Sequence, residues 1–359
     1  MFFGTLVLLI MLVFGMPVAF ALGIAGMVGL FTIGGLSMVE GVLRTVALST
    51  TSSYELLTIP MFILMAEFII VSRIADELFD CAKTWVGRTP AGLAISTALA
   101  GAGFGAISGS STASAATLSA TTIPAMLRNN YNPRFASGVV AISGPLAMLI
   151  PPSIALILYG LIADISIGKL LIAGIIPGLL VTCVIILTSL LLVAIFPHFA
   201  PAGRAYSMGE KFRSLTIIGP MVVLIMLVTG CIYLGIATPT ESASLGAFGA
   251  MCIAFARKRL TFQSFYIALR KAAATSCMIV LIIICAHIFS YYFTLTGVTQ
   301  ELVALVASLD VESWVILLLI ILLYLVLGCF MDQIAILFLT VPITLPIILA
   351  LGYDPFWFG

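Results

Sequence analysis

Residues 101–117 read GAGFGAISGSSTASAAT, in the middle of an otherwise apolar segment that runs from residue 91 to residue 127. The stretch carries too many hydroxyl groups and glycines for a lipid-facing helix, and irregular backbone at membrane depth is tolerated only where protein or a water-filled cavity covers it. Basic residues stand beside both ends, at Arg88 and Arg128. Because basic loops gather on one side of a membrane, the segment is predicted to be a re-entrant helical hairpin with its tip near residues 108–114.

The rest of the chain is apolar enough to lie in a membrane. Hydrophobic residues make up 62% of the 359 and charged residues 8%, against about 25% charged residues in soluble domains, and the mean hydropathy is +1.29. Apolar runs of about 20 residues recur along the chain, and each is long enough to cross hydrocarbon as a helix. We therefore predict an all-α, polytopic transmembrane helical bundle.

Composition also excludes several functions. The net charge of +1 gives no reason to expect a nucleic-acid partner. The seven cysteines are scattered in apolar sequence without metal-ligand spacing, and His198 and His287 are the two histidines. Two isolated imidazoles cannot form a metal cluster or a catalytic triad, so the sequence is not expected to be an enzyme.

The chain contains an internal repeat. A shift of 222 positions places residues 113–133 on residues 335–355 with six of the 21 pairs identical, including Tyr131 with Tyr353 and Pro133 with Pro355. The match extends upstream, where Pro17 meets Pro239 at the same offset and further identities align with shifts of one or two residues. The constant order and nearly constant offset of these identities indicate a duplication.

The basic residues give the two copies opposite orientations. Lys and Arg are concentrated around residues 73–88, 128–134, 204–213 and 257–271. The counterparts of the first two loops hold no basic residue, since the segment after Thr296 carries Glu301, Asp310 and Glu312 and the later turn carries Asp354. Cytoplasmic loops hold the excess of Lys and Arg, so equivalent loops should lie on opposite sides. This is an inverted-topology repeat, the architecture of many secondary transporters.

These observations divide the chain into three parts. We predict a first repeat over residues 1–136 with its hairpin at about 91–127, a proline-broken helix with connecting spans over 137–236, and a second repeat over 237–359 with a second re-entrant hairpin at about 314–350. Residues 1–34 fit either one kinked span or a short helix followed by a full one. The second repeat ends before any counterpart of the helix at 137–160, so we expect the chain to be truncated at its C-terminus.

The two hairpin tips are expected to hold ligands. Helix N-termini present free N–H groups and partial positive charge, which suit a carboxylate, while hydroxyls and unwound carbonyls suit Na⁺. The first tip offers five hydroxyls within seven residues, and the alternative is that these small residues only let helices pack closely. The hydroxyls belong to Ser108, Ser110, Ser111, Thr112 and Ser114.

A helix broken by prolines follows the first hairpin, with the sequence SGPLAMLIPPS over residues 143–153. Its prolines remove hydrogen-bond donors and should free carbonyls, although a simple kink without a site is the alternative. Four acidic residues lie in or beside apolar sequence, at Glu55, Glu67, Glu241 and Asp332. Asp332 could bind Na⁺ or bond backbone N–H groups of its hairpin, whereas Glu67 and Glu241 could be purely structural.

The hydroxyl-rich tip, the GP…IPPS helix, the TPTESASLGA segment and the GCFMD hairpin together resemble the large membrane subunit of tripartite ATP-independent periplasmic (TRAP) transporters. The resemblance covers essentially the whole chain. It implies a multi-pass Na⁺ symporter of the bacterial inner membrane that moves by an elevator mechanism. It also implies two partners, a small four-helix membrane subunit and a periplasmic substrate-binding protein.

By this resemblance, ligand roles are carried over to the two tips and the broken helix. The expected Na⁺ ligands are Ser108, Gly109, Ser110, Ser111, Gly144, Pro145, Gly328, Cys329 and Asp332. The expected substrate-binding residues are Ser108, Ser111, Thr112, Pro151 and Asp332.

The function expected from this resemblance is Na⁺-coupled uptake of a small organic acid, of the dicarboxylate or sialic-acid type, delivered by the periplasmic protein. The alternative is a single-subunit dicarboxylate or citrate carrier with a similar inverted-hairpin plan and no binding protein. The sequence shows neither a selectivity-filter ring, as a channel would need, nor a nucleophile and base of an enzyme.

Overall fold

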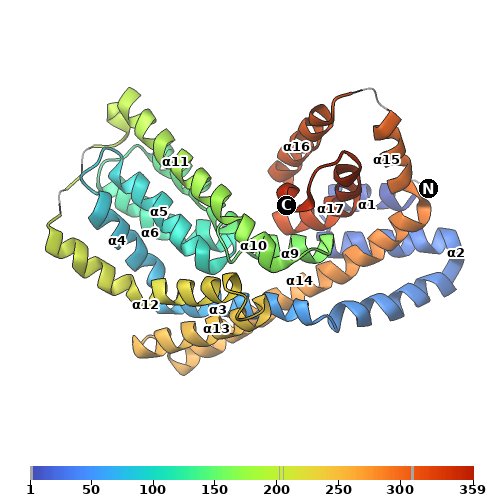
Figure 1. Ribbon diagram of the computed structural model, residues 1–359, viewed down its shortest axis with the longest axis horizontal. Helices are drawn as coiled ribbons and strands as arrows, with labels where there is room; N and C mark the ends of the chain where they lie inside the picture. Colours follow the sequence, from blue (N-terminus) through green and yellow to red (C-terminus); the bar gives the residue numbers. More distant parts are fainter. Residues whose placement is uncertain (1–2, 202, 205, 309–310) are drawn as a thin grey trace. The chain divides into compact units, whose positions relative to one another are not determined.

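The computed structural model describes residues 3–201, 203–204, 206–308 and 311–359, and every regular element in these ranges is a helix (Figure 1). The elements are α1 (Phe3–Val13), α2 (Val18–Thr51), η1 (Tyr54–Leu57), α3 (Thr58–Ser72), α4 (Ile74–Val86), α5 (Gly92–Ser108), α6 (Ser111–Arg128), α7 (Pro133–Ser143), α8 (Leu146–Leu149), α9 (Ile154–Ala163), α10 (Ile167–Ala173), α11 (Ile175–Ile195), η2 (Pro197–Phe199), α12 (Met208–Tyr233), α13 (Pro239–Ala256), α14 (Phe262–Thr296), α15 (Val298–Ser308), α16 (Ser313–Phe330), α17 (Gln333–Ala350) and α18 (Pro355–Phe358).

The predicted all-α, polytopic bundle is confirmed. Within the described residues, six helical stretches are long and apolar enough to cross a membrane, and a seventh span results if α7–α8 and α9 are counted together across their break. The N-terminal residues form the second of the two predicted arrangements, a short α1 followed by the long α2.

Both predicted hairpins are present as helix pairs. The first, α5 and α6, covers residues 92–128 against the predicted 91–127, and its two helices lie side by side (Figure 1). The second, α16 and α17, covers residues 313–350 against the predicted 314–350. The first breaks at Gly109, whose φ of 58° is left-handed, and the second at Met331 and Asp332.

The same backbone conformation and the same helix cap follow both hairpins, at the offset found in the sequence. After each hairpin a residue takes a left-handed conformation, Asn130 at φ 58° and Gly352 at φ 81°, and these are two of the residue types that visit this region most readily. Asn132 and Asp354 then cap the following helix, and each accepts hydrogen bonds from two backbone N–H groups beyond a proline.

One element departs from the repeat. α14 runs unbroken from Phe262 to Thr296, whereas its first-repeat counterpart is divided between the end of α2 and α3. Pro60 lies in the first turn of α3, where its missing N–H costs no helical hydrogen bond. A proline at that position suits a helix start and favours the division, although α6, α12 and α17 each continue through an internal proline.

The chain forms two compact units. Unit 1 comprises residues 1–56, 158–166 and 274–359, and unit 2 comprises residues 57–157 and 167–273. At the repeat offset of 222 positions, residue 274 corresponds to residue 52. Each unit therefore combines the first portion of one repeat with the last portion of the other, so the first hairpin belongs to unit 2 and the second to unit 1.

In unit 1, isoleucines hold the second hairpin together. Ile316 and Ile320 of α16 pack with Ile347 and Ile348 of α17 in one buried cluster. At the end of the hairpin, the Tyr159 hydroxyl donates a hydrogen bond of 2.8 Å to the carbonyl of Pro355. The hairpin is thus fixed at its base and along its length.

In unit 2, α3 and α13 pack closely. The hydroxyls of Thr58 and Thr240 lie 2.6 Å apart in a buried hydrogen bond at the start of both helices. Glu241 forms a capping box with Thr238, whose N–H donates to the Glu241 carboxylate at 2.8 Å. Of the two roles predicted for Glu241, the structure shows the structural one, helix capping.

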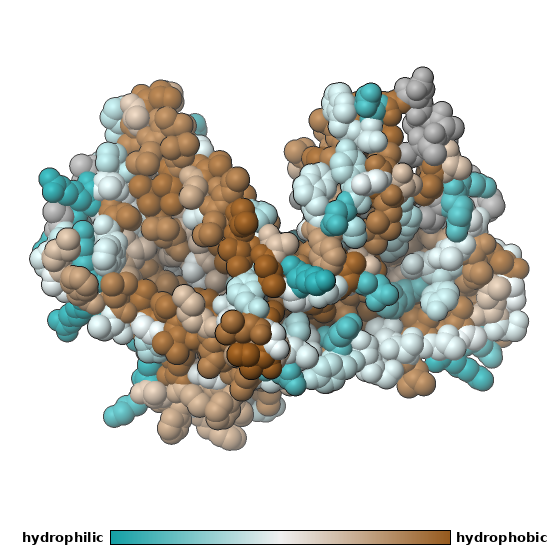
Figure 2. Space-filling model, in the orientation of Figure 1, coloured by the Kyte–Doolittle hydropathy of each residue, from teal (hydrophilic) through white to brown (hydrophobic). Residues whose placement is uncertain are grey.

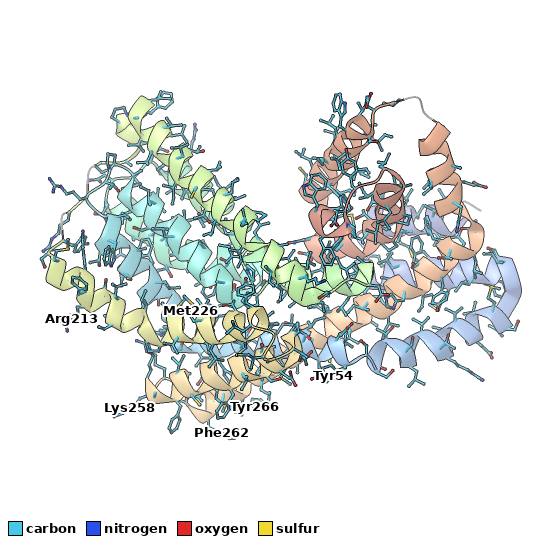
Figure 3. The ribbon with its side chains drawn as sticks, viewed as in Figure 1. Tyr54, Arg213, Met226, Lys258, Phe262 and Tyr266 are labelled. Carbon is cyan, nitrogen blue, oxygen red and sulfur yellow. The ribbon has the colours of Figure 1, made fainter. Side chains whose placement is uncertain are left out.

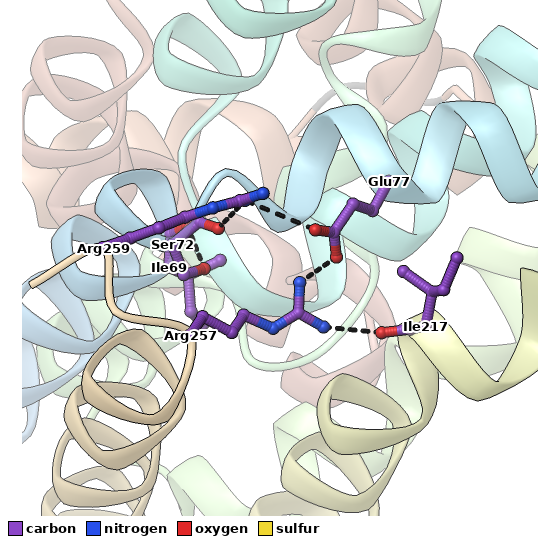
Figure 4. A network of polar contacts seen from close by, with 6 residues as sticks. All are labelled: Ile69, Ser72, Glu77, Ile217, Arg257 and Arg259. Carbon is purple, nitrogen blue, oxygen red and sulfur yellow. Dashed lines mark hydrogen bonds and ion pairs between the residues drawn. The ribbon is translucent and has the colours of Figure 1, made fainter.

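An ion-pair network ties α4 to the junction of α13 and α14 (Figure 4). The Glu77 carboxylate pairs with Arg257 and, at 3.3 Å, with Arg259. Arg257 also donates to the carbonyl of Ile217 and Arg259 to that of Ser72, each at 2.5 Å. The carboxylate thus holds two guanidinium groups that in turn bond the end of α3 and the middle of α12.

Replacing Glu77 with glutamine should lower the free energy of unfolding by about 1.5–3 kcal/mol, the contribution of hydrogen bonds to charged groups. The side chains of Glu77 and Arg257 are each only 19% exposed, so solvent cannot fully replace the lost pairing. The matched control is Glu301→Gln at the equivalent, exposed position of the second repeat. Equal unfolding curves for both variants in detergent would contradict a stabilising role for the network.

The predicted inverted topology can be tested by labelling at two exposed positions. Lys258 follows α13, beside Phe262 and Tyr266, which point outward at the start of α14 and are 87% and 60% exposed (Figure 3). Glu312 is the exposed residue before α16. Asp310, which the sequence also placed on the outer side, lies outside the described residues.

In a background without the seven native cysteines, Lys258→Cys should react with an impermeant thiol reagent only from the cytoplasm. Glu312→Cys should react only from the periplasm. The expectation follows from the distribution of Lys and Arg. Labelling of both cysteines from one side would refute the inverted repeat.

Candidate functional site

The base of the first hairpin is closed by a tyrosine. The Tyr131 hydroxyl, on the turn after α6, accepts a hydrogen bond of 3.1 Å from the N–H of Leu93 at the start of α5. Tyr131 is 5% exposed, and this burial raises the pKa of its hydroxyl. The phenol therefore stays neutral at physiological pH and joins the two ends of the hairpin.

The tip is formed by a left-handed glycine and a serine cap. Gly109 reverses the chain after α5, and Ser110 then caps α6, because its hydroxyl accepts from the N–H of Ala113 at 3.4 Å. The Ser110 hydroxyl also lies 3.1 Å from that of Thr112. From the sequence alone, the hydroxyl-rich tip was predicted as a whole to hold ligands. In the structure, the Ser110 hydroxyl serves as the N-terminal cap of α6.

Two other hydroxyls at the tip are buried and have no partner. Ser108, the last residue of α5, is 2% exposed, and Ser114, in the first turn of α6, is 0% exposed. Among the described residues, neither oxygen finds a hydrogen-bond partner. A buried polar group without a partner costs about 1–3 kcal/mol, so these two oxygens suit a ligand that enters the tip.

A row of glycines on α5 faces the broken helix. A Cβ at Gly101 would lie 2.9 Å from the carbonyl oxygen of Ser143, and one at Gly105 would lie 2.6 Å from the Cα of Ala147. At the tip, a Cβ on Gly109 would lie 3.0 Å from the carbonyl oxygen of Pro152. Because the three positions are four residues apart, they share one face of the helix and let its backbone lie directly against residues 143–154.

The broken helix brings backbone carbonyls beside the tip. α7, α8 and α9 are separated at Gly144–Pro145 and at residues 150–153. Pro151 and Pro152 have no N–H to donate to the carbonyls of Ala147 and Met148 one turn earlier. The Ser153 hydroxyl bonds the Met148 carbonyl at 2.5 Å, and the N–H of Ile154 donates to the carbonyl of Gly109 at 3.3 Å.

The tip therefore presents two kinds of electrostatic surface. The C-terminus of α5 carries partial negative charge and the N-terminus of α6 partial positive charge. The unpartnered hydroxyls of Ser108 and Ser114 are neutral oxygen ligands at this boundary. Within the described residues no group of three or more His, Cys, Asp or Glu side chains could hold a metal. Neutral oxygens at a broken helix suit Na⁺, and the free N–H groups suit a carboxylate.

The structure brings together most of the predicted residues of the first site. Ser108, Gly109, Gly144 and Pro151 are buried, Ser110 and Ser111 are half-buried, and Thr112 and Pro145 are exposed. Gly144 lies against α6, where its Cβ would come within 2.8 Å of the Ala115 Cβ.

The second tip is more open. Gly328, Cys329 and Asp332 are all exposed, and the Asp332 carboxylate caps α17 by accepting from the N–H of Ile334 at 3.2 Å. Asp332 thus bonds a hairpin N–H group, one of its two predicted roles, and its binding of Na⁺ stays a prediction. Glu55 is likewise exposed, and Glu67 is half-buried on α3, where the positive charge of Lys271 acts on it.

Ser114 and Ser242 are candidate site residues that were not among the predicted ligands. Ser114 belongs to the hydroxyl run that the sequence singled out but was not among the expected ligands, because sequence spacing does not reveal which hydroxyls lack a partner. Ser242 of α13 is also buried without a partner, and only the TPTESAS segment pointed toward it.

Comparison with known proteins gives a consistent picture. The chain matches the family described as tripartite ATP-independent periplasmic transporter, DctM component, over residues 5–359. It is 34% identical over 361 residues to the isethionate TRAP transporter permease protein DctMQ of Oleidesulfovibrio alaskensis, which covers 97% of this chain and 54% of that protein. The chain thus spans about half the length of that relative.

Two further relatives are named for other substrates. The C4-dicarboxylate TRAP transporter large permease protein DctM of Pseudomonas aeruginosa is 33% identical over 311 residues, with 86% of this chain and 72% of that protein covered. The sialic acid TRAP transporter large permease protein SiaM of Vibrio cholerae is 32% identical over 314 residues, with the same coverage of 86% and 72%.

Proposed function

The chain belongs to the DctM component family of tripartite ATP-independent periplasmic transporters, and from this premise we propose that it is the large membrane subunit of a Na⁺-coupled importer of small organic acids in a bacterial inner membrane. The family is one of multi-pass transporter subunits rather than enzymes. The observation that carries the ion coupling is the pair of buried, unpartnered hydroxyls of Ser108 and Ser114.

In this proposal Na⁺ is a transported ion rather than a resident cofactor. It binds the Ser108 hydroxyl at the C-terminal end of α5, where the helix dipole favours a cation, and the Ser114 hydroxyl in the adjoining first turn of α6. Ser111 and Thr112, in the first turn of α6, face the anionic group of the substrate through their backbone N–H groups. Bound Na⁺ would satisfy both hydroxyls and favour the folded tip, which links ion binding to substrate binding.

The substrate class is a small organic anion. The relatives are named for isethionate, C4-dicarboxylates and sialic acid, and each compound carries at least one anionic acid group. A helix N-terminus recognises such a group without requiring a particular carbon skeleton. Within this class we propose a carboxylate of the dicarboxylate or sialic-acid type.

We also propose an elevator movement and two partners. Close packing of α5 on residues 143–154 supports the movement, since the hairpin and the broken helix can then shift as one body. The partners are a small four-helix membrane subunit and a periplasmic substrate-binding protein, as in the systems after which the family is named.

Uptake into vesicles that contain both membrane subunits should depend on the periplasmic protein. With a Na⁺ gradient and a radiolabelled acid, uptake should rise at least tenfold above background when the loaded binding protein is added outside. A single-subunit carrier, the alternative plan, would transport the free acid equally well without that protein. Equal uptake in both conditions would therefore replace the tripartite proposal with the alternative.

A further inference from the structure

A groove lies in unit 2, on the side of α7 that faces α11. It has a volume of about 510 Å³ and is walled by Val139 and Ile142 of α7 and by Ile185 and Leu192 of α11. Gly138 lines it as well, and a Cβ there would meet no atom within 4 Å. The groove is therefore apolar and partly held open by a missing side chain.

One end of the groove is polar and basic. Asn132, Arg134 and His198 line it there, together with Phe199. The His198 ring lies edge-on to Phe199 with ring centroids 4.8 Å apart. Arg134 is exposed, and no described residue forms a hydrogen bond or ion pair with its guanidinium. The distribution of Lys and Arg places this end on the cytoplasmic side.

The surface around the groove suits lipid. On α11, Leu187, Leu191 and Ile195 are 59%, 55% and 66% exposed, and Ile142 of α7 is 50% exposed. Figure 2 shows brown, hydrophobic surface along α11. Exposed aliphatic side chains of this density are stable against hydrocarbon but not against water.

We propose that the groove binds an anionic phospholipid of the cytoplasmic leaflet, with its phosphate on Arg134 and one acyl chain between α7 and α11. The eight residue steps from Arg134 to Ile142 span about 12 Å of helix, close to the ~15 Å half-thickness of a hydrocarbon core. Basic pockets between transmembrane helices on the cytoplasmic side bind anionic headgroups in this way.

The lining of the groove matches an acyl chain. An extended acyl chain needs no hydrogen-bond partners along its length, so it suits the apolar walls formed by α7 and α11. Charge complementarity with Arg134 then favours an anionic over a zwitterionic headgroup.

The test is native mass spectrometry of the purified protein titrated with phosphatidylglycerol or with phosphatidylcholine of the same acyl chains. Wild type should bind phosphatidylglycerol more tightly. Arg134→Gln should weaken that binding about fivefold, the effect of one basic residue near a membrane surface, and leave phosphatidylcholine unaffected. Arg134→Lys should restore the preference. Arg128→Gln, an exposed arginine outside the groove, is the matched control and should bind as wild type.

Gly138→Leu fills the groove and should reduce binding of both lipids at least tenfold. Its control is Gly230→Leu on α12, where a Cβ also meets no atom within 4 Å and which does not line this groove. The proposal is overturned if wild type binds both lipids equally, if Arg128→Gln matches Arg134→Gln, or if Gly138→Leu retains lipid. Crosslinking of a Gly138→Cys variant to a co-purified membrane subunit would likewise replace the lipid with a protein occupant.

Discussion

Gly105→Val is expected to leave little folded protein in the membrane, with a loss of about 3 kcal/mol or more in the free energy of unfolding, at the upper end for overpacking a core. A Cβ at Gly105 would lie 2.6 Å from the Cα of Ala147 and 2.9 Å from its nitrogen. Both are backbone atoms, so no flexible side chain can move away. The hairpin would have to separate from the broken helix, and the site between them would be lost.

The control for this prediction is Gly230→Val, which introduces the same side chain into α12 of the same unit at a position where a Cβ meets no atom within 4 Å. Membrane abundance and thermal unfolding in detergent measure both variants. Near-normal behaviour of the control with loss of the Gly105 variant would attribute the effect to contact with Ala147. Equal membrane abundance and equal unfolding of the two variants would contradict the close packing of α5 against residues 143–154.

Ser108→Ala and Ser114→Ala should each raise the Na⁺ concentration that gives half-maximal uptake. Loss of one ligand oxygen costs about 1–3 kcal/mol, which corresponds to roughly 5–150-fold in affinity. Neither hydroxyl has a hydrogen-bond partner in the part of the chain that the structure describes, so thermal stability without Na⁺ should not fall. An affinity loss at unchanged stability separates ligand binding from packing.

Two serines of the same hairpin serve as controls. The Ser110 hydroxyl caps α6, so Ser110→Ala should lower stability by about 1 kcal/mol, the usual cost of a lost cap. The Ser96 hydroxyl bonds the carbonyl of Gly92 at 2.7 Å, away from the tip, so Ser96→Ala should leave Na⁺ affinity unchanged. If Ser108→Ala and Ser114→Ala lose stability but keep wild-type Na⁺ affinity, the small residues of the tip serve packing alone.

The hairpins were predictable because their sequence signals are local. The glycine and hydroxyl content of residues 101–117 and the basic residues around it placed the first hairpin within one residue of its observed bounds. The turn after it was equally readable, since the asparagine and proline at Asn132 and Pro133 recur as Asp354 and Pro355. The hairpin and its turn both depend on residues that are close together in the sequence, so both can be predicted from the sequence alone.

The role of each side chain at the tips was not predictable in the same way. Ser108, Ser110 and Ser114 are alike in sequence, yet one caps a helix and two are buried without partners. The difference depends on the left-handed turn at Gly109 and on the backbone of residues 143–154, which lies far away in sequence. Asp332 was equally ambiguous, because a carboxylate can serve an ion or a helix N-terminus; the structure shows its hydrogen bond to the N–H of Ile334, and its role toward Na⁺ stays a prediction.

The central claim is that Na⁺ drives transport through the first hairpin tip. The direct measurement is initial uptake of the acid into vesicles with both membrane subunits and the loaded binding protein, with Na⁺ replaced by choline under a maintained proton gradient. We predict that uptake falls to background in choline and rises with Na⁺ to saturation, with more than one ion per substrate. Equal uptake in choline would contradict the claim, because the transporter would then be coupled to protons and the buried hydroxyls of Ser108 and Ser114 would need another role.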